Sequence, residues 1–137
     1  MNVWYLDSSA IVKFAVVEEE TAAIVRWRTE LDPGDVLFTS ELAVAEVLRA
    51  VRRVKGDVDV ALAHLDSLEQ LVMDRDLMLA AGELDPPNIR TLDAIHLAAA
   101  LAGGEELNGI VTYDGPMANA ARQLGLVALA PGGQSPG

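Results

Sequence analysis

The sequence predicts an α/β fold in which a short parallel β-sheet is flanked by helices on both faces. Short apolar runs that end in polar turns alternate along the chain with segments whose apolar residues recur at helical spacing. A length of 137 residues suits one domain, and 51% hydrophobic residues allow it a sizeable core. We expect one α/β domain over residues 1–130 and a disordered Pro/Gly/Ser-rich tail over 131–137.

The first half of the chain predicts two strands among helices. The apolar run Val3–Leu6 is closed by Asp7-Ser8-Ser9, which indicates a strand and a polar turn before a helix over 10–17. Further helices are expected over 21–31, over 40–55 with Ser40 as N-cap, and over 58–70, and a second strand over 36–39.

The second half continues the alternation. Strands are expected over 71–74, 109–113 and 126–129, and helices over 77–84, over 91–101 with Thr91 as N-cap, and over 116–124. Gly103-Gly104 is a typical end for the second of these helices.

Charge and composition restrict the function. The net charge of −11 argues against non-specific nucleic-acid binding, so a nucleic-acid enzyme with this charge needs bound metal ions or a basic patch to offset it. The same acidity suits a basic protein partner. With no cysteine, thiolate chemistry is excluded. No signal peptide or apolar run approaching the roughly 20 residues of a membrane span is visible, and we expect a cytoplasmic protein.

Four acidic residues point to one edge of the predicted sheet. Asp7 and Asp114 each follow a strand, and ligands of parallel sheets bind outside the carboxyl ends of the strands. Glu46 lies in the second turn of the helix that follows the second strand, and Asp93 lies in the first turn of the helix over 91–101. The position of Asp93 is less well fixed, because no strong strand precedes it.

Each acid also has a purely structural explanation. Asp7 and Asp114 suit N-caps, Asp93 suits the positive end of a helix dipole, and Glu46 has the spacing to pair with Arg49. Four converging carboxylates would nevertheless repel one another unless a cation lay between them. Carboxylate oxygens without thiolate ligands suit Mg²⁺ or Mn²⁺, which activate water and stabilise phosphodiester displacement.

Four sequence blocks carry a resemblance to a known family. They are Leu6-Asp7-Ser8-Ser9-Ala10, Ala45-Glu46-Val47-Leu48-Arg49, Arg90-Thr91-Leu92-Asp93-Ala94-Ile95-His96-Leu97-Ala98 and Val111-Thr112-Tyr113-Asp114. In type and order they resemble the signature blocks of PIN-domain ribonucleases of the VapC type, the toxins of prokaryotic toxin–antitoxin pairs. The Arg90–Ala98 block is the most specific of the four.

The resemblance implies a Rossmann-like PIN fold and a Mg²⁺- or Mn²⁺-dependent endoribonuclease. It also implies a homodimer and a small VapB-like antitoxin that blocks the site. Carried over to this chain, the acidic quartet that binds metal and activates water is Asp7, Glu46, Asp93 and Asp114. A hydroxyl at Ser8 or Ser9 and another at Thr112 support it. Some PIN nucleases have a further acid after the last Asp, where this chain has Gly115-Pro116, so we expect one metal ion.

Two secondary features have competing interpretations. The densest basic segment contains Arg49, Arg52, Arg53 and Lys55. It is either a binding surface for RNA phosphates beside the site or a solvated helix end. His96 lies one turn from Asp93, so a metal-binding or general-base role is conceivable, but its apolar neighbours favour a buried, hydrogen-bonded histidine.

Two other classes of function remain open on the sequence. A Mg²⁺-dependent phosphoacceptor of the receiver type also uses carboxylates at a parallel sheet edge, but it needs paired acids after the first strand and a late lysine. Here Asp7 has no acidic neighbour before Glu18, and the only lysines are Lys13 and Lys55. The second alternative is a PIN fold that binds without catalysing, which the intact quartet disfavours.

Overall fold

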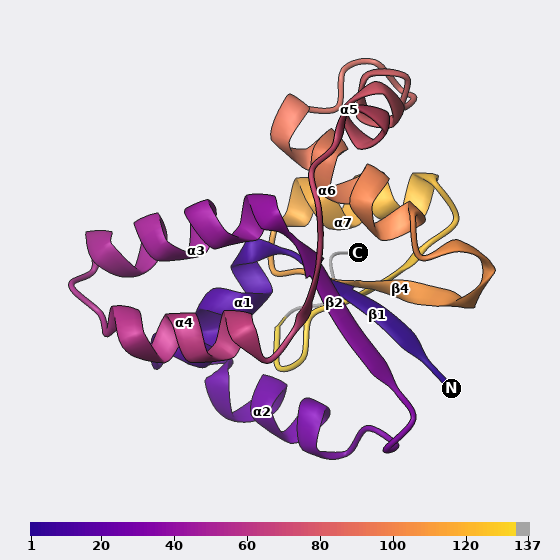
Figure 1. Ribbon diagram of the computed structural model, residues 1–137. Coiled ribbons are helices and arrows are strands. Elements are labelled where there is room, and N and C mark those ends of the chain that lie inside the picture. The colour runs from indigo at the N-terminus through magenta and orange to yellow at the C-terminus, as the bar shows by residue number, and fades with distance from the viewer. Residues whose placement is uncertain (134–137) are drawn as a thin grey trace.

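The computed structural model describes residues 1–133 and contains one parallel sheet with helices on both faces (Figure 1). Its strands, in spatial order, are β3 (Glu69–Leu71), β2 (Val36–Ser40), β1 (Val3–Leu6), β4 (Leu107–Val111) and β5 (Val127–Leu129). Every neighbouring pair is parallel, so all the carboxyl ends meet at one edge. The predicted fold class is confirmed.

The helices divide between the two faces of the sheet (Figure 1). One face carries α1 (Ser8–Ala15), α2 (Thr21–Thr29), α3 (Glu41–Arg53) and α4 (Val58–Asp66). The other carries α5 (Arg75–Gly82), α6 (Thr91–Leu101) and α7 (Gly115–Gln123), with a short 3₁₀ turn, Gly104–Glu106, before β4.

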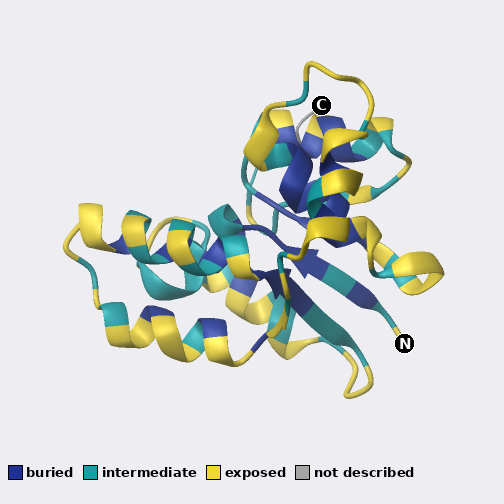
Figure 2. Ribbon diagram, turned by 45° about the horizontal axis from the view of Figure 1, so that its top comes forward, coloured by how far each residue is buried: buried dark blue, intermediate teal, exposed yellow. Residues whose placement is uncertain are grey.

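Alternation along the strands builds two cores, one on each face. In β1, Tyr5 packs with α6 and α7, whereas Leu6 packs with α1 and α3, and both side chains are fully buried. Figure 2 shows the same division, with buried residues in the strands and on the inner sides of the helices. The ends of the central strands are therefore held rigidly from both sides.

The third predicted strand was misplaced. β3 covers Glu69–Leu71 rather than 71–74, and α4 ends at Asp66 instead of continuing to residue 70. The polar segment 69–71 extends the sheet by pairing with Phe38–Ser40, and backbone pairing of this kind leaves no apolar periodicity in the sequence. Asp74 instead caps α5, accepting a hydrogen bond from the Leu77 amide at 2.9 Å.

Two predicted helix caps also differ in detail. Thr91 is the first residue of α6, and the N-cap is Arg90, whose backbone is extended. Ser40 is the N-cap of α3 as predicted, but its side chain makes no capping hydrogen bond.

The strand expected over 109–113 begins earlier, at Leu107, and includes Gly109. A Cβ at Gly109 would lie 2.1 Å from the Val127 carbonyl oxygen, so the close approach of β4 and β5 requires glycine.

The strand order argues against the phosphoacceptor alternative. The order β3-β2-β1-β4-β5 places the topological switch between β1 and β4, whereas receiver domains have the order 2-1-3-4-5.

Within residues 1–133, no helix has the length and apolar character to cross a membrane. Of the predicted tail, residues 134–137 lie outside the described part. Residues 131–133 form a turn, where the Pro131 carbonyl accepts a hydrogen bond from the Tyr113 hydroxyl at 2.7 Å.

Candidate active site

The acidic residues singled out from the sequence lie around the switch point between β1 and β4. Asp7 directly follows β1 and is the N-cap of α1, and Asp114 is the N-cap of α7, which follows β4. Glu46 lies on α3, and Asp93 lies in the first turn of α6. The capping roles considered for Asp7 and Asp114 are therefore real, and they position both carboxyl groups at the carboxyl edge.

Asp7 is the buried member of the group, with 3% of its surface exposed. Its Oδ1 accepts hydrogen bonds from Ser9 Oγ at 2.6 Å and from the Ala10 amide at 3.1 Å, and its Oδ2 accepts one from Thr112 Oγ1. Burial raises the pKa of the Asp7 carboxyl, and the hydrogen bonds from Ser9 and Thr112 oppose that rise. Asp7 is thus a desolvated carboxyl group held in a fixed orientation.

Thr112 connects the two strand-end aspartates. Its hydroxyl donates to Asp7 and accepts a hydrogen bond from the Asp114 amide at 3.1 Å. Ser9 makes a parallel connection, because its Oγ donates to Asp7 and accepts from the Tyr113 amide at 2.8 Å. Both hydroxyls therefore tie the start of α1 to the loop after β4.

Glu46 is held by a different set of groups. Its Oε1 lies 2.6 Å from Ser8 Oγ, which donates to it, and 2.6 Å from His96 Nε2. Burial raises the pKa of Glu46, but the hydrogen bonds with His96 and Ser8 outweigh it, so the pKa lies below its ordinary value. The two serines left as alternatives from the sequence therefore have separate tasks, Ser8 at Glu46 and Ser9 at Asp7.

His96 is the buried, hydrogen-bonded histidine expected from its apolar neighbours. It is 3% exposed, and its Nδ1 lies 2.7 Å from the Tyr5 hydroxyl, which also hydrogen-bonds Ser40 Oγ at 3.0 Å. Burial raises the pKa of Tyr5. Because both ring nitrogens have partners, His96 is fixed in orientation and holds Glu46 rather than facing the open edge.

Arg90 bridges the remaining two carboxylates. Its guanidinium donates to Asp93 Oδ2, with Nε and one terminal nitrogen each at 3.0 Å, and the same terminal nitrogen lies 3.5 Å from Asp114 Oδ2. The other Asp114 oxygen accepts from the Met117 amide at 3.1 Å. Arg90 was not predicted as a site residue, although its i,i+3 spacing to Asp93 was a usable signal in the sequence.

The four carboxylates do not form a ready-made metal cage. Within residues 1–133, no three acidic or histidine side chains are arranged to hold one ion. Instead, Glu46 is paired with His96, and Asp93 and Asp114 share Arg90. The donor chemistry still fits a hard divalent cation, because carboxylate and hydroxyl oxygens dominate the edge.

The structure brings one member of the predicted basic patch to the site. Arg49, Arg52, Arg53 and Lys55 are all exposed around the end of α3. Among them, Arg53 lines a cavity of about 430 Å³ that also includes Ser8, Glu46, Lys13 and Tyr113. Lys13 is partly engaged there, since its Nζ lies 2.9 Å from Glu20 and over the Tyr113 ring. The cavity leads from the acidic edge toward the patch.

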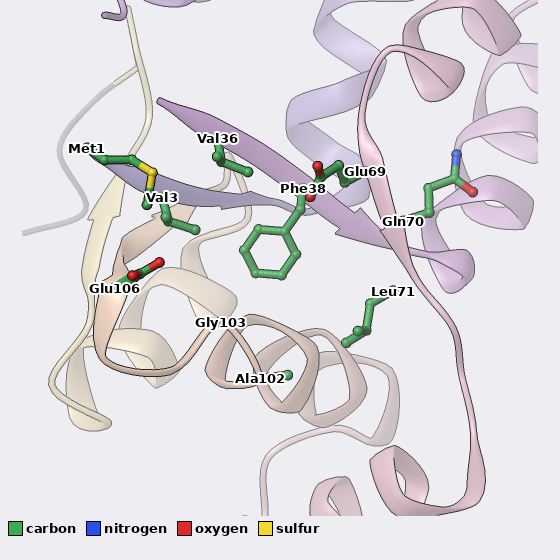
Figure 3. Close-up of a pocket in the computed structure, with 10 residues that line it drawn as sticks. All are labelled: Met1, Val3, Val36, Phe38, Glu69, Gln70, Leu71, Ala102, Gly103 and Glu106. Carbon is green, nitrogen blue, oxygen red and sulfur yellow. The ribbon is translucent and has the colours of Figure 1, made fainter. Parts of the chain in front are cut away.

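A separate apolar cavity of about 360 Å³ lies at the opposite end of the sheet (Figure 3). It is bounded by Val3 and Val36, at the starts of β1 and β2, and by the segment after α6. Figure 3 shows the Phe38 ring pointing into it. None of the four candidate acids lines this cavity.

Comparisons with known proteins identify the family of the chain. The family model described as PIN domain matches residues 4–123. Ribonuclease VapC46 of Mycobacterium tuberculosis is 46% identical over 136 residues, covering 96% of this chain and 99% of the relative. Ribonuclease VapC47 of the same species is 36% identical, covering 93% of this chain and 96% of the relative.

A solved structure supports the fold independently. The crystal structure of Mycobacterium tuberculosis VapC20, described as a toxin that cleaves the sarcin–ricin loop, matches with a TM-score of 0.71. The match covers 93% of this chain and 99% of that one at 18% identity. The family match over most of the chain and these relatives show that the chain belongs to the PIN-domain family, as a member of its VapC group.

Proposed function

We propose that this chain is a Mg²⁺- or Mn²⁺-dependent endoribonuclease that acts as the toxin of a VapBC-type toxin–antitoxin pair. The observation that carries the proposal is the gathering of Asp7, Glu46, Asp93 and Asp114 at the carboxyl edge between β1 and β4. It is supported by relatives named Ribonuclease VapC that match nearly the whole chain.

The metal would be held by this acidic quartet. When bound, Mg²⁺ or Mn²⁺ supplies an activated water and offsets the charge of the phosphodiester during displacement. We expect one ion, because Gly115-Pro116 follows Asp114 and adds no further carboxylate. The cation would also offset the mutual repulsion of carboxylates in a chain of net charge −11.

The residues of the chain prepare the site in distinct ways. Ser9 and Thr112 hold Asp7 so that its orientation does not depend on solvent. His96 and Ser8 hold Glu46 in place and lower its pKa, so it is an ionised acceptor of hydrogen bonds at neutral pH. Preorganised groups of this kind need no costly reorientation when substrate binds.

The substrate and partners follow from the same placement. RNA phosphates would approach through the cavity lined by Arg53, and the basic residues Arg49, Arg52 and Lys55 would extend that path along α3. The net charge of −11 favours a basic partner, as expected for a VapB-like antitoxin. We place the protein in the cytoplasm as a homodimer that the antitoxin holds inactive.

The test is cleavage of structured RNA with Mn²⁺ or Mg²⁺ by the wild type and by Asp7→Asn and Asp93→Asn. Cleavage by the wild type should stop in EDTA and fall by at least about a hundredfold in either variant, as expected when a metal ligand is removed. Circular dichroism establishes that the variants are folded. Equal cleavage by all three proteins would remove the nuclease assignment. Absence of an adjacent short reading frame for a basic-tailed, DNA-binding-like protein would weaken only the toxin role.

A further inference from the structure

A second cavity opens onto the acidic edge on the side of α6 and α7. Its volume is about 570 Å³, within the range of roughly 300–1,000 Å³ typical of small-ligand sites. It shares Arg90 and Asp93 with the candidate active site and extends from them toward α7, away from Arg53. A substrate that reached the carboxylates would therefore have a path on each side of them.

The outer part of this cavity carries primary amides. Asn119 and Gln123 lie four residues apart on α7 and so share one face of the helix, and Asn88 lies on the loop before α6. All three are exposed, and within residues 1–133 no hydrogen bond occupies their side chains. Each amide offers a donor and an acceptor side by side, which matches the edge of a nucleobase.

Arg90 supplies the charge that the amides lack. Its exposed guanidinium lies between the carboxylates of Asp93 and Asp114 and the amide-bearing part of the cavity. Its Nε and one terminal nitrogen contact Asp93, and its other terminal nitrogen can donate to a phosphate oxygen. Ile89 and Ala120 add apolar wall for the flat face of a base.

We infer that this cavity binds one unpaired nucleotide of the RNA substrate next to the scissile phosphate. Asn119 and Gln123 contact the edge of its base, and Arg90 contacts its phosphate. The inference rests on the proposed ribonuclease function and deepens it, because it assigns base selection to α7. Sequence-specific recognition of RNA is generally directed at unpaired bases whose edges are open to hydrogen bonding.

The test compares the wild type with the double variant Asn119→Ala/Gln123→Ala on RNA carrying a randomised single-stranded segment. Sequencing the cleavage ends gives the base preference at each position around the cut. The wild type should prefer particular bases at one position beside the cut, and the double variant should reduce that preference by about fivefold or more, as expected for one lost amide–base contact. Gln70→Ala, on β3 outside this cavity, is the control; it removes the hydrogen bond from Gln70 Nε2 to the Leu65 carbonyl at 3.0 Å but should leave the base preference unchanged.

The outcomes separate this inference from the function on which it rests. If neither the wild type nor Gln70→Ala cleaves any RNA with metal, the ribonuclease proposal fails. If both cleave and the double variant keeps the wild-type preference, or the wild type has no preference beside the cut, the nucleotide site fails alone. Alanine is well tolerated at exposed helix positions, and thermal melting checks that the double variant is folded.

Binding gives a readout that does not need turnover. With Asp7→Asn as background, a short single-stranded RNA should bind about fivefold more weakly when the two α7 amides are also removed. Equal affinity with and without those amides would overturn the site.

Discussion

Replacing Thr112 by Val should destabilise the protein by removing one hydroxyl with almost no change of shape. Thr112 is 1% exposed, and its hydroxyl donates to the buried Asp7 carboxyl and accepts from the Asp114 amide. A hydrogen bond to a charged group contributes about 1.5–3 kcal/mol, and a neutral one about 0.5–1.5 kcal/mol. Asp7 keeps Ser9 and Ala10 as donors, so we expect a loss of about 2–4 kcal/mol in the free energy of unfolding.

The matched control is Thr112→Ser, which retains the hydroxyl and loses one methyl group. Burial of a methyl group contributes about 0.8 kcal/mol, so this variant should lose about 1 kcal/mol. Equilibrium unfolding in urea, followed by circular dichroism in EDTA, gives the free energy by linear extrapolation. If the Val and Ser variants were equally stable, the hydroxyl would not hold Asp7, and our account of Asp7 orientation would fail.

Three further predictions concern charge at the same edge. Asp7→Asn should raise the metal-free free energy of unfolding at neutral pH. Burial raises the Asp7 pKa, so the folded wild type binds more protons than the unfolded chain and loses stability as pH rises from the ordinary carboxyl pKa through the raised one. Urea titrations at several pH values should show this loss in the wild type and not in Asp7→Asn. Arg90→Gln should tighten Mn²⁺ binding about threefold to tenfold in calorimetry, since a competing cation is removed, and unchanged affinity would contradict that. The same substitution should leave the free energy of unfolding nearly unchanged, because the Arg90 ion pairs are exposed. Arg53→Gln should weaken RNA binding and lower the slope of log affinity against log salt by about one, whereas Arg52→Gln, outside the cavity shared with Glu46, should change both less.

The sequence predicts the carboxyl edge well because parallel strands make it a simple geometric consequence. Asp7 and Asp114 follow strands whose apolar runs are clear, so their shared edge needs no knowledge of strand order. Glu46 is placed by the helix after β2 for the same reason. The position of Asp93 was less well fixed by the sequence pattern alone. In the structure, Asp93 is connected to Asp114 through Arg90.

The side-chain partners could not be predicted, because they depend on tertiary distances. Arg90 sits beside a helix start, a position where sequence rules expect acids or caps rather than a cation. The contact between His96 and Glu46 joins α6 to α3 across 50 residues of sequence, and no local pattern reports it. The prediction put β3 at the wrong residues, because Glu69 and Gln70 are exposed and β3 pairs through its backbone alone.

The arrangement of these partners explains how four carboxylates lie at one edge without a preformed ion cage. Glu46 is hydrogen-bonded by His96 and Ser8, Asp93 and Asp114 are paired with Arg90, and Asp7 is stabilised by hydroxyl and amide donors. Local contacts of this kind reduce the mutual repulsion of the carboxylates.

Under the proposed function, a divalent ion must compete with these pairings before it can bring the carboxylates together. The exposed Arg90 contacts are the weaker ones and should yield first, whereas His96 is buried and fixed by Tyr5 and should keep Glu46 in place. Removing Arg90 and removing His96 should therefore act in opposite directions on metal affinity: the first change removes a competitor, and the second releases the carboxylate that the ion needs.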